Sequence, residues 1–379
     1  MKHGIISRLQ PEAPFKYQAW PTVTQDERGG LYAVASRRLC HVDPFGSIVL
    51  FVSEDGGETW SEGRVVIDTP YDDRDPGIVY LGGGRLMISF YYHTASLYVT
   101  NEDRLFIRWQ ERIAHEMLEP TLERMRDGTV GSSYVCFSDD YGEHWEHADR
   151  DGVVRDVKNT LISVPISAPH GATLIKKTMT RSDGITLTEG DLLFVGKESY
   201  SGLLGIPVLL GTEGGRVWSQ IGGLDTGDLP KNRYWEAHAI QLESGRLLAA
   251  FRVREGSSLE LAVWSTYSDD GGITWTPVKK LCDGSPPHLL QLADGRALLS
   301  YSYRDHTKEP SGIRALISDD GGEHWSEVIR VTPQPIVKPY DDLGYPATLQ
   351  LADGSLFTAY YMHAEEDPYP SILYTKWQI

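Results

Sequence analysis

The stretch DLGYPATLQLADGSLFTAYY, residues 342–361, consists of two hydrophobic runs joined by a short acidic turn. The turn is at Asp353-Gly354, and each flanking run is long enough to form one β-strand. Glycine accepts the positive φ angle that such a tight turn requires. A single phenol, Tyr345, stands where the first run begins. The stretch is therefore predicted to be a β-hairpin with a polar residue at the start of its first strand.

The same strand–turn–strand pattern occurs six times along the chain. Its copies begin near Trp20-Pro21, Asp75-Pro76, Pro169-His170, Glu236-Ala-His238, Pro287-His288 and Tyr345-Pro346. A second repeat, of the form S-x-D-x-G-x-x-W, occurs at 53–60, 138–145, 268–275 and 318–325, with a degenerate copy at 212–218. Its Asp can accept bonds from turn N–H groups, and its Trp can cover the hairpin. Each copy of this second repeat is predicted to be a turn between two outer strands.

Six inner hairpins, most of them followed by an outer hairpin, predict six four-stranded sheets. A radial array of such sheets is an all-β, six-bladed β-propeller, here a single domain over residues 1–379. The last sheet has one clear strand, 371–377, after its inner hairpin, so residues near 3–8 are expected to supply the missing strand. Residues 102–126 are rich in helix formers and predict a helical insertion in blade two, at about 100–127. This insertion is a candidate for a lid or for a contact between subunits.

Bulk composition excludes several classes of function. The formal net charge is −17, so a nucleic acid or an anionic membrane is not an expected partner. Three widely spaced cysteines indicate reduced thiols, and no apolar run reaches the length of a membrane span. The amino-terminal residues lack a signal-like apolar core, so we expect a cytoplasmic protein. No metal-ligand spacing is evident, and neither a metal nor a cofactor is predicted.

Functional residues are expected where the innermost strands begin, because in a propeller these positions face one central funnel. Titratable side chains dominate the positions, which indicates a binding or catalytic site. Several arginines on or after neighbouring strands could grip a carboxylate or a pair of sugar hydroxyls. The residues predicted to bind substrate are Arg38, Arg74, Asp75, His170, His238, Arg252, His288, Arg304 and Arg314.

The S-x-D-x-G-x-x-W motifs resemble the Asp boxes of the sialidase superfamily, and the order of other residues is similar to that family too. Sialidases carry a catalytic Tyr at the start of a strand before an Asp-Gly turn, as Tyr345 does here. They carry a Glu followed about one hairpin later by an Arg, which Glu236 and Arg252 match. Arg314 matches an Arg before a late Asp box, and Asp43 matches the acid/base before the first one.

The resemblance implies an exo-acting glycoside hydrolase whose nucleophile is Tyr345. Glu236 would take the phenol proton, and Asp43 would protonate the leaving oxygen and then activate water. The chain departs from the family at Ala19, where sialidases carry the first arginine that grips the substrate carboxylate. Arg38 or Arg74 could supply a substitute charge. The expected substrate is a carbohydrate with a non-reducing terminal sugar that is sialic-acid-like, or otherwise acidic or deoxy.

Two alternatives remain open at the level of sequence. One is a glycosidase or lyase that uses His170, His238 or His288 on rhamnose- or uronate-ended oligosaccharides. The other is a sugar-binding propeller without catalysis, because Asp boxes are structural and occur in non-enzymes.

Overall fold

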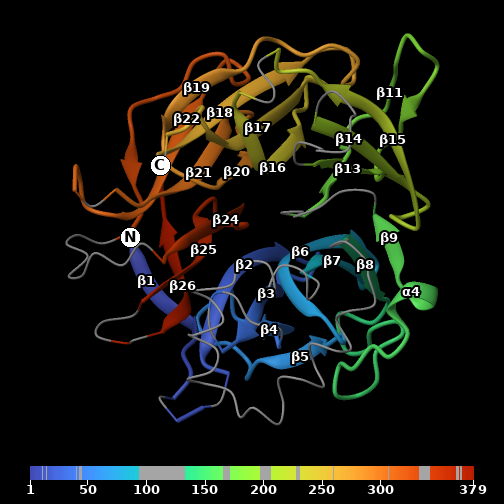
Figure 1. The fold of residues 1–379 in the computed structure, drawn as a ribbon, viewed down its shortest axis with the longest axis vertical. Helices are drawn as coiled ribbons and strands as arrows, with labels where there is room; N and C mark the ends of the chain where they lie inside the picture. The colour runs from blue at the N-terminus through green and yellow to red at the C-terminus, as the bar shows by residue number, and fades with distance from the viewer. Residues whose placement is uncertain are drawn as a thin grey trace.

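Six four-stranded antiparallel sheets surround a common centre in the computed structural model of the chain (Figure 1). The structure describes residues 1–10, 12–13, 15–39, 41, 45–93, 133–164, 171–196, 206–227, 231–258, 260–305, 307–332, 342–363, 367 and 369–379. The predicted six-bladed β-propeller is confirmed. In five of the described blades the innermost strand comes first in sequence and later strands follow outward, whereas the sixth blade takes its outermost strand from the amino terminus.

The first three blades contain strands β2 to β15. Blade one is β2 (Tyr17–Gln25), β3 (Leu31–Arg38), β4 (Ser47–Ser53) and β5 (Arg64–Ile67). Blade two is β6 (Asp72–Gly82), β7 (Arg85–His93), β8 (Ser133–Ser138) and β9 (Ile162–Val164), with a short helix, α4 (Val157–Thr160), before β9. Blade three is β10 (Thr173–Leu174), β13 (Leu192–Val195), β14 (Ile206–Thr212) and β15 (Val217–Leu224). A separate hairpin, β11 (Met179–Thr180) and β12 (Thr186–Leu187), separates β10 from β13.

The last three blades complete the ring. Blade four is β16 (Arg233–Gln241), β17 (Leu247–Arg254), β18 (Leu261–Ser268) and β19 (Lys279–Asp283). Blade five is β20 (Pro287–Gln291), β21 (Ala297–Tyr303), β22 (Gly312–Ser318) and β23 (Ile329–Arg330). Blade six is β24 (Gly344–Gln350), β25 (Leu356–His363) and β26 (Pro370–Trp377), joined by β1 (Lys2–Ser7).

The amino-terminal strand closes the ring, as predicted. β1 pairs antiparallel with β26, with Lys2 opposite Lys376 and Ile5 opposite Leu373. The first and last strands of the chain therefore share one blade. The helical insertion predicted at about 100–127 lies outside the described residues, between β7 and β8.

The hydrophobic core is divided into six clusters, each packed between two neighbouring blades. Strand β3 shows how one strand serves two clusters. Leu31, Ala33 and Ala35 face blade six, while Tyr32 and Val34 face blade two. Side chains alternate between the two faces of a strand, and here both faces are buried. This double burial explains why the middle strands read as continuous hydrophobic runs.

The Asp boxes form the turns between the third and fourth strands of their blades. In the copy at 268–275, Ser268 Oγ donates to Asp270 Oδ1 at 2.8 Å and accepts from the Gly272 N–H at 2.8 Å. Asp270 Oδ1 in turn accepts from the Thr274 N–H at 2.9 Å. The motif therefore satisfies its own turn, at the end of the strands opposite to Arg252.

Candidate active site

Four innermost strands carry the same irregularity at the same place. Register shifts between the first two strands of blades one, two, four and six leave two residues opposite one. The first residue of each bulge has a positive φ: 57° at Trp20, 50° at Asp75, 47° at Glu236 and 51° at Tyr345. For a non-glycine residue this conformation costs about 1–2 kcal/mol. Such bulges re-aim side chains and are common beside functional sites.

Proline at the next position is the sequence signal of this bulge. Pro21, Pro76 and Pro346 follow Trp20, Asp75 and Tyr345. A proline lacks the N–H that a regular ladder would need, so within a sheet it suits a bulge or an edge strand. The fourth bulge has Ala237 instead, and its sequence carries no comparable signal.

The bulges of blades four and six bring Tyr345 and Glu236 into direct contact. The Tyr345 hydroxyl donates a hydrogen bond to Glu236 Oε1. Arg252, on the strand beside Glu236, donates from Nη1 to the same oxygen at 2.7 Å. Tyr345 is 8% exposed, and the side chains of Glu236 and Arg252 are 12% and 21% exposed. A phenol, a carboxylate and a guanidinium thus converge in a mostly buried, hydrogen-bonded group.

Electrostatics keep this phenol protonated. Burial raises the pKa of Tyr345 well above its usual value, the negative charges of Glu236 and Asp75 raise it further, and Arg252 acts in the opposite direction. A neutral phenol is a weak nucleophile unless a neighbouring base takes its proton. The Glu236 carboxylate already accepts that proton in a hydrogen bond, so it is placed to act as the base.

Asp75 is the bulge residue of blade two, and its charge acts on the same group. Burial raises the pKa of Asp75 to about 6, and the charge of Glu236 contributes to the increase, although Arg74 opposes it. Its nearest described cation, Arg74 Nε, lies 4.0 Å from Oδ2, and Oδ1 is buried with no hydrogen-bond partner among the described residues. The site therefore holds a second carboxyl group that is protonated in mildly acidic solution.

The bulge residue of blade one is Trp20, and not Ala19. Ala19 is fully buried and pairs with Ser36 in the regular part of the sheet. The Trp20 ring lies 6.2 Å from the Tyr345 ring, centroid to centroid. Trp20, where the sequence places the start of this inner strand, therefore presents a large aromatic ring to Tyr345.

Arg38 and Arg74 both stack on Trp20. Their guanidinium carbons lie 4.8 and 4.6 Å from the centroid of its ring. Both also bind the buried Asp72: Arg38 Nη2 donates to Oδ1, and Arg74 Nη1 lies 3.4 Å from Oδ2. The positive charge of the two arginines is thus shared with one carboxylate.

A polar network next to Trp20 has no counterpart in the sequence predictions. The Tyr17 hydroxyl donates to Asp342 Oδ2 at 2.8 Å and lies 2.7 Å from His41 Nδ1, which is 3.2 Å from Asp342 Oδ1. The Tyr361 hydroxyl donates to Asp342 as well, at 3.0 Å. Burial alone would raise the pKa of Asp342, but these bonds and the His41 charge outweigh it and lower the pKa to about 2.

The two remaining arginines predicted to bind substrate differ in position. Arg304 faces the site, since its guanidinium carbon lies 6.0 Å from the centroid of the Tyr345 ring. Its Nε and Nη2 atoms are buried and have no hydrogen-bond partner among the described residues. Arg314 instead stacks on Tyr303 at 3.6 Å and forms an ion pair with Glu309 at 3.0 Å. The structure therefore brings Arg304, and not Arg314, to the tyrosine.

The predicted histidines line a different cavity. His238 and His288 stack with their ring centroids 4.3 Å apart, in a cavity of about 410 Å³ whose lining includes neither Tyr345 nor Glu236. His238 Nδ1 accepts from the Leu289 N–H at 3.1 Å, and His288 Nδ1 accepts from the Thr348 N–H at 3.4 Å. Each ring thus binds backbone of the next blade. His170 and Asp43 lie outside the described residues.

No group of His, Cys, Asp and Glu among the described residues could hold a metal ion. Within the same residues, no helix is both long and apolar enough to cross a bilayer.

Comparison with known proteins agrees with this fold. The family model of the BNR repeat-like domain matches residues 105–358, and the BNR/Asp-box repeat model matches residues 51–62. The fold defines a sialidase-like β-propeller. The chain belongs to the BNR repeat-like family. No match is found among curated proteins.

Solved structures of similar fold include both glycosidases and a protein of unknown function. The latter, from Dyadobacter fermentans, is 22% identical, with a TM-score of 0.68 over 100% of this chain and 98% of the other. The NanB sialidase of Streptococcus pneumoniae is 13% identical, with a TM-score of 0.65 over 99% and 70%. An α-L-arabinanase of Penicillium chrysogenum is 12% identical, with a TM-score of 0.61 over 99% and 98%. At these identities the likeness establishes the fold alone.

Proposed function

We propose that the protein is an exo-acting glycoside hydrolase that removes a non-reducing terminal sugar from a glycan. The observation that carries the proposal is the contact of Tyr345 with Glu236, which also binds Arg252. The phenol has a base in hydrogen-bond contact and a guanidinium that stabilises the charge of that base. These are the parts of an activated nucleophile.

In the proposed reaction, Tyr345 Oη attacks the anomeric carbon while its proton passes to Glu236 Oε1. The bond to the leaving oxygen breaks as that oxygen receives a proton from a carboxylic acid. Water then attacks the anomeric carbon and breaks its bond to Tyr345 Oη. The carboxylate left by the acid takes a proton from the water, and Glu236 returns its proton to the phenolate. The sequence nominates Asp43 as this acid. Among the described residues, Asp75 is a second candidate for this acid, because its pKa of about 6 keeps it protonated in mildly acidic solution.

The charges around Tyr345 support an acidic or deoxy sugar as substrate. Arg252 pairs with Glu236, and Arg38 and Arg74 share the single carboxylate of Asp72, so each of these arginines already contacts a carboxylate of the protein. Arg304 forms no ion pair with a described residue and has two N–H groups without a described partner. One such guanidinium suits a single carboxylate or two vicinal hydroxyls.

A panel of 4-nitrophenyl glycosides of neutral, deoxy and acidic sugars tests the proposal. At least one should be cleaved, and Tyr345→Phe should lower kcat/KM by at least about 100-fold. An unchanged melting temperature would show that the variant is folded. Full activity in Tyr345→Phe would refute the mechanism, and sugar binding without any turnover would indicate a sugar-binding propeller instead.

A further inference from the structure

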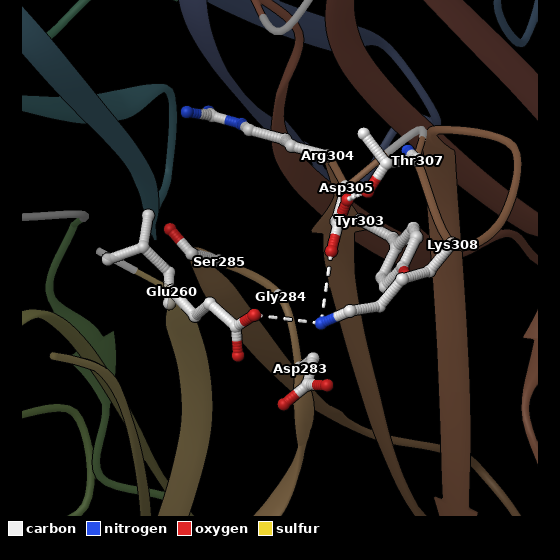
Figure 2. A pocket seen from close by; sticks show the side chains of 10 residues that line it. Glu260, Asp283, Gly284, Ser285, Tyr303, Arg304, Asp305, Thr307 and Lys308 are labelled. Atoms are coloured by element: carbon white, nitrogen blue, oxygen red, sulfur yellow. Dashed lines mark hydrogen bonds and ion pairs between the residues drawn. The ribbon is translucent and has the colours of Figure 1, made fainter. Parts of the chain in front are cut away.

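A cavity of about 570 Å³ lies between blades four and five, next to the Tyr345 group (Figure 2). Its walls come from the start of β18, the end of β19 and the segment that follows β21. Arg304 links the cavity to the Tyr345 group, because it lines the cavity while its guanidinium carbon lies 6.0 Å from the centroid of the Tyr345 ring. A ligand held at Tyr345 could therefore extend into this cavity.

Two groups in the wall lack hydrogen-bond partners among the described residues. Ser285 is 1% exposed, and its Oγ has no hydrogen-bond partner among the described residues. The same holds for Nε and Nη2 of Arg304. Ser285 and the Arg304 guanidinium lie on the same side of the cavity in Figure 2. A buried polar group without a partner costs about 1–3 kcal/mol, so its presence in a cavity wall indicates a partner that comes from outside.

The cavity lining also offers acceptors whose charge is partly balanced. Lys308 Nζ lies 2.8 Å from Glu260 Oε1 and 3.1 Å from Asp305 Oδ2, and Figure 2 shows it between them. With Asp283, the lining holds three carboxylates against two cations, Arg304 and Lys308. This balance disfavours an anionic ligand. A lining that holds both hydrogen-bond acceptors and donors suits a ligand that carries many hydroxyl groups, each able to donate and accept.

We infer that this cavity binds a neutral, hydroxyl-rich sugar unit, the one joined to the sugar that reacts at Tyr345. Ser285 Oγ would exchange hydrogen bonds with its hydroxyls, Glu260 and Asp305 would accept from them, and Arg304 would lie at the junction with the reacting sugar. That this sugar adjoins the reacting sugar rests on the proposed function, whereas the binding of a neutral sugar in the cavity does not.

Binding of methyl glycosides of galactose, glucose and rhamnose, measured by titration calorimetry or ligand-observed NMR, tests the site itself. At least one should bind the full-length protein, and Glu260→Gln and Ser285→Ala should each weaken it by about 10-fold. Ser285→Ala should not lower the melting temperature, because the hydroxyl makes no bond with the described residues and its removal relieves an unpaired buried polar group. Glu255→Gln is the matched control: Glu255 pairs with Lys280 at 3.1 Å but does not line the cavity.

The inference is overturned if no methyl glycoside binds, or if the cavity variants weaken binding no more than Glu255→Gln does. A second measurement separates this failure from failure of the hydrolase. For a 4-nitrophenyl glycoside that is cleaved, kcat/KM is compared with kcat/KM for a disaccharide. In this disaccharide the same reacting sugar is joined to the neutral sugar that binds the cavity. Glu260→Gln should lower the disaccharide-to-aryl ratio by about 10-fold. Sugar binding without any cleavage would refute the hydrolase alone, and cleavage with an unchanged ratio would refute the subsite alone.

Discussion

At the scale of single residues, the site depends on side chains that would be unfavourable elsewhere. Asp75 and Tyr345 are mostly buried ionisable groups, and both stand in the left-handed region of φ. Burial of a charged group and strain in the backbone both cost stability, and such features are retained where function requires them. Substitution of Asp75 should therefore lower activity and raise stability.

The stability of an Asp75→Asn variant follows from the raised pKa of Asp75. The folded protein holds this pKa at about 6, above the usual 3.8, so folding disfavours the ionised form. This group therefore destabilises the wild type progressively as the pH rises from about 4 through 6. Asn cannot ionise, so the variant should be more stable at pH 7 by up to about 3 kcal/mol, and little changed at pH 4. Urea unfolding at both pH values measures this, and an equal effect at pH 4 and pH 7 would contradict it.

The kinetic role of Asp75 is tested by varying the leaving group. A nitrophenolate leaves without a proton, whereas an alkoxide needs one. If Asp75 is the acid, Asp75→Asn should lower kcat/KM for methyl glycosides at least about 100-fold more than for 4-nitrophenyl glycosides. The wild-type kcat/KM for methyl glycosides should also fall above about pH 6. Asp43→Asn is the comparison: if it shows the leaving-group dependence and Asp75→Asn does not, Asp43 is the acid.

The positions of two arginines show what the sequence around a single residue does not predict. Arg304 and Arg314 both follow or lie on strands of blade five, and sequence spacing matches Arg314 to the sialidase pattern. In the structure, Arg304 follows β21 and faces Tyr345, while Arg314 turns to Tyr303 and Glu309. Which face a side chain takes at the end of a strand depends on the local backbone, and the sequence does not report it.

At the scale of elements, the repeated motifs divide into turns that stabilise and strand starts that carry chemistry. The Asp box at 268–275 is satisfied by its own side chains, and these lie at the far end of the sheet from the bulges. This division made the fold predictable: turn residues and hydrophobic runs are local signals. Tyr345, Glu236 and Arg252 could be nominated because they stand at equivalent points of the repeats.

The network of His41, Tyr17, Asp342 and Tyr361 could not be predicted in this way. Its members come from blades one and six and lie up to 344 positions apart. No repeat or spacing connects them. Such a contact exists only after the ring has closed.

An Asp-box substitution tests the structural role of these turns. Ser268→Ala removes an acceptor from the Gly272 N–H and a donor to Asp270, both inside a buried turn. The free energy of unfolding should fall by about 1–3 kcal/mol, while glycoside turnover at 25 °C stays unchanged. Ser244→Ala, at an exposed inner turn, is the control and should change stability little. Lost turnover in a folded Ser268→Ala protein would place the Asp box in the catalytic machinery and contradict this division.

At the scale of the whole molecule, the site exists because blades distant in sequence meet at one centre. Tyr345 comes from blade six, Glu236 and Arg252 from blade four, Arg304 follows a strand of blade five, and Asp75 comes from blade two. β1 closes the ring by pairing with β26. Integrity of the ring and assembly of the site should therefore be linked.

Removal of residues 1–8 tests this link. The deletion exposes the edge of β26 and removes Ile6 from the cluster between blades six and one. The melting temperature should fall by more than about 5 °C, and turnover should be lost at the same lower temperature. Removal of Gln378 and Ile379, which follow β26 and are exposed, is the control and should change little. An unchanged melting temperature after the deletion would show that β1 does not hold the ring closed.

The most direct measurement of the central claim is mass spectrometry of the protein quenched with acid during turnover of its best aryl glycoside. The account predicts a glycosyl adduct on the peptide that carries Tyr345, absent from Tyr345→Phe and reduced in Glu236→Gln. An adduct on any other residue, or its persistence in Tyr345→Phe, would contradict the assignment of Tyr345 as the nucleophile.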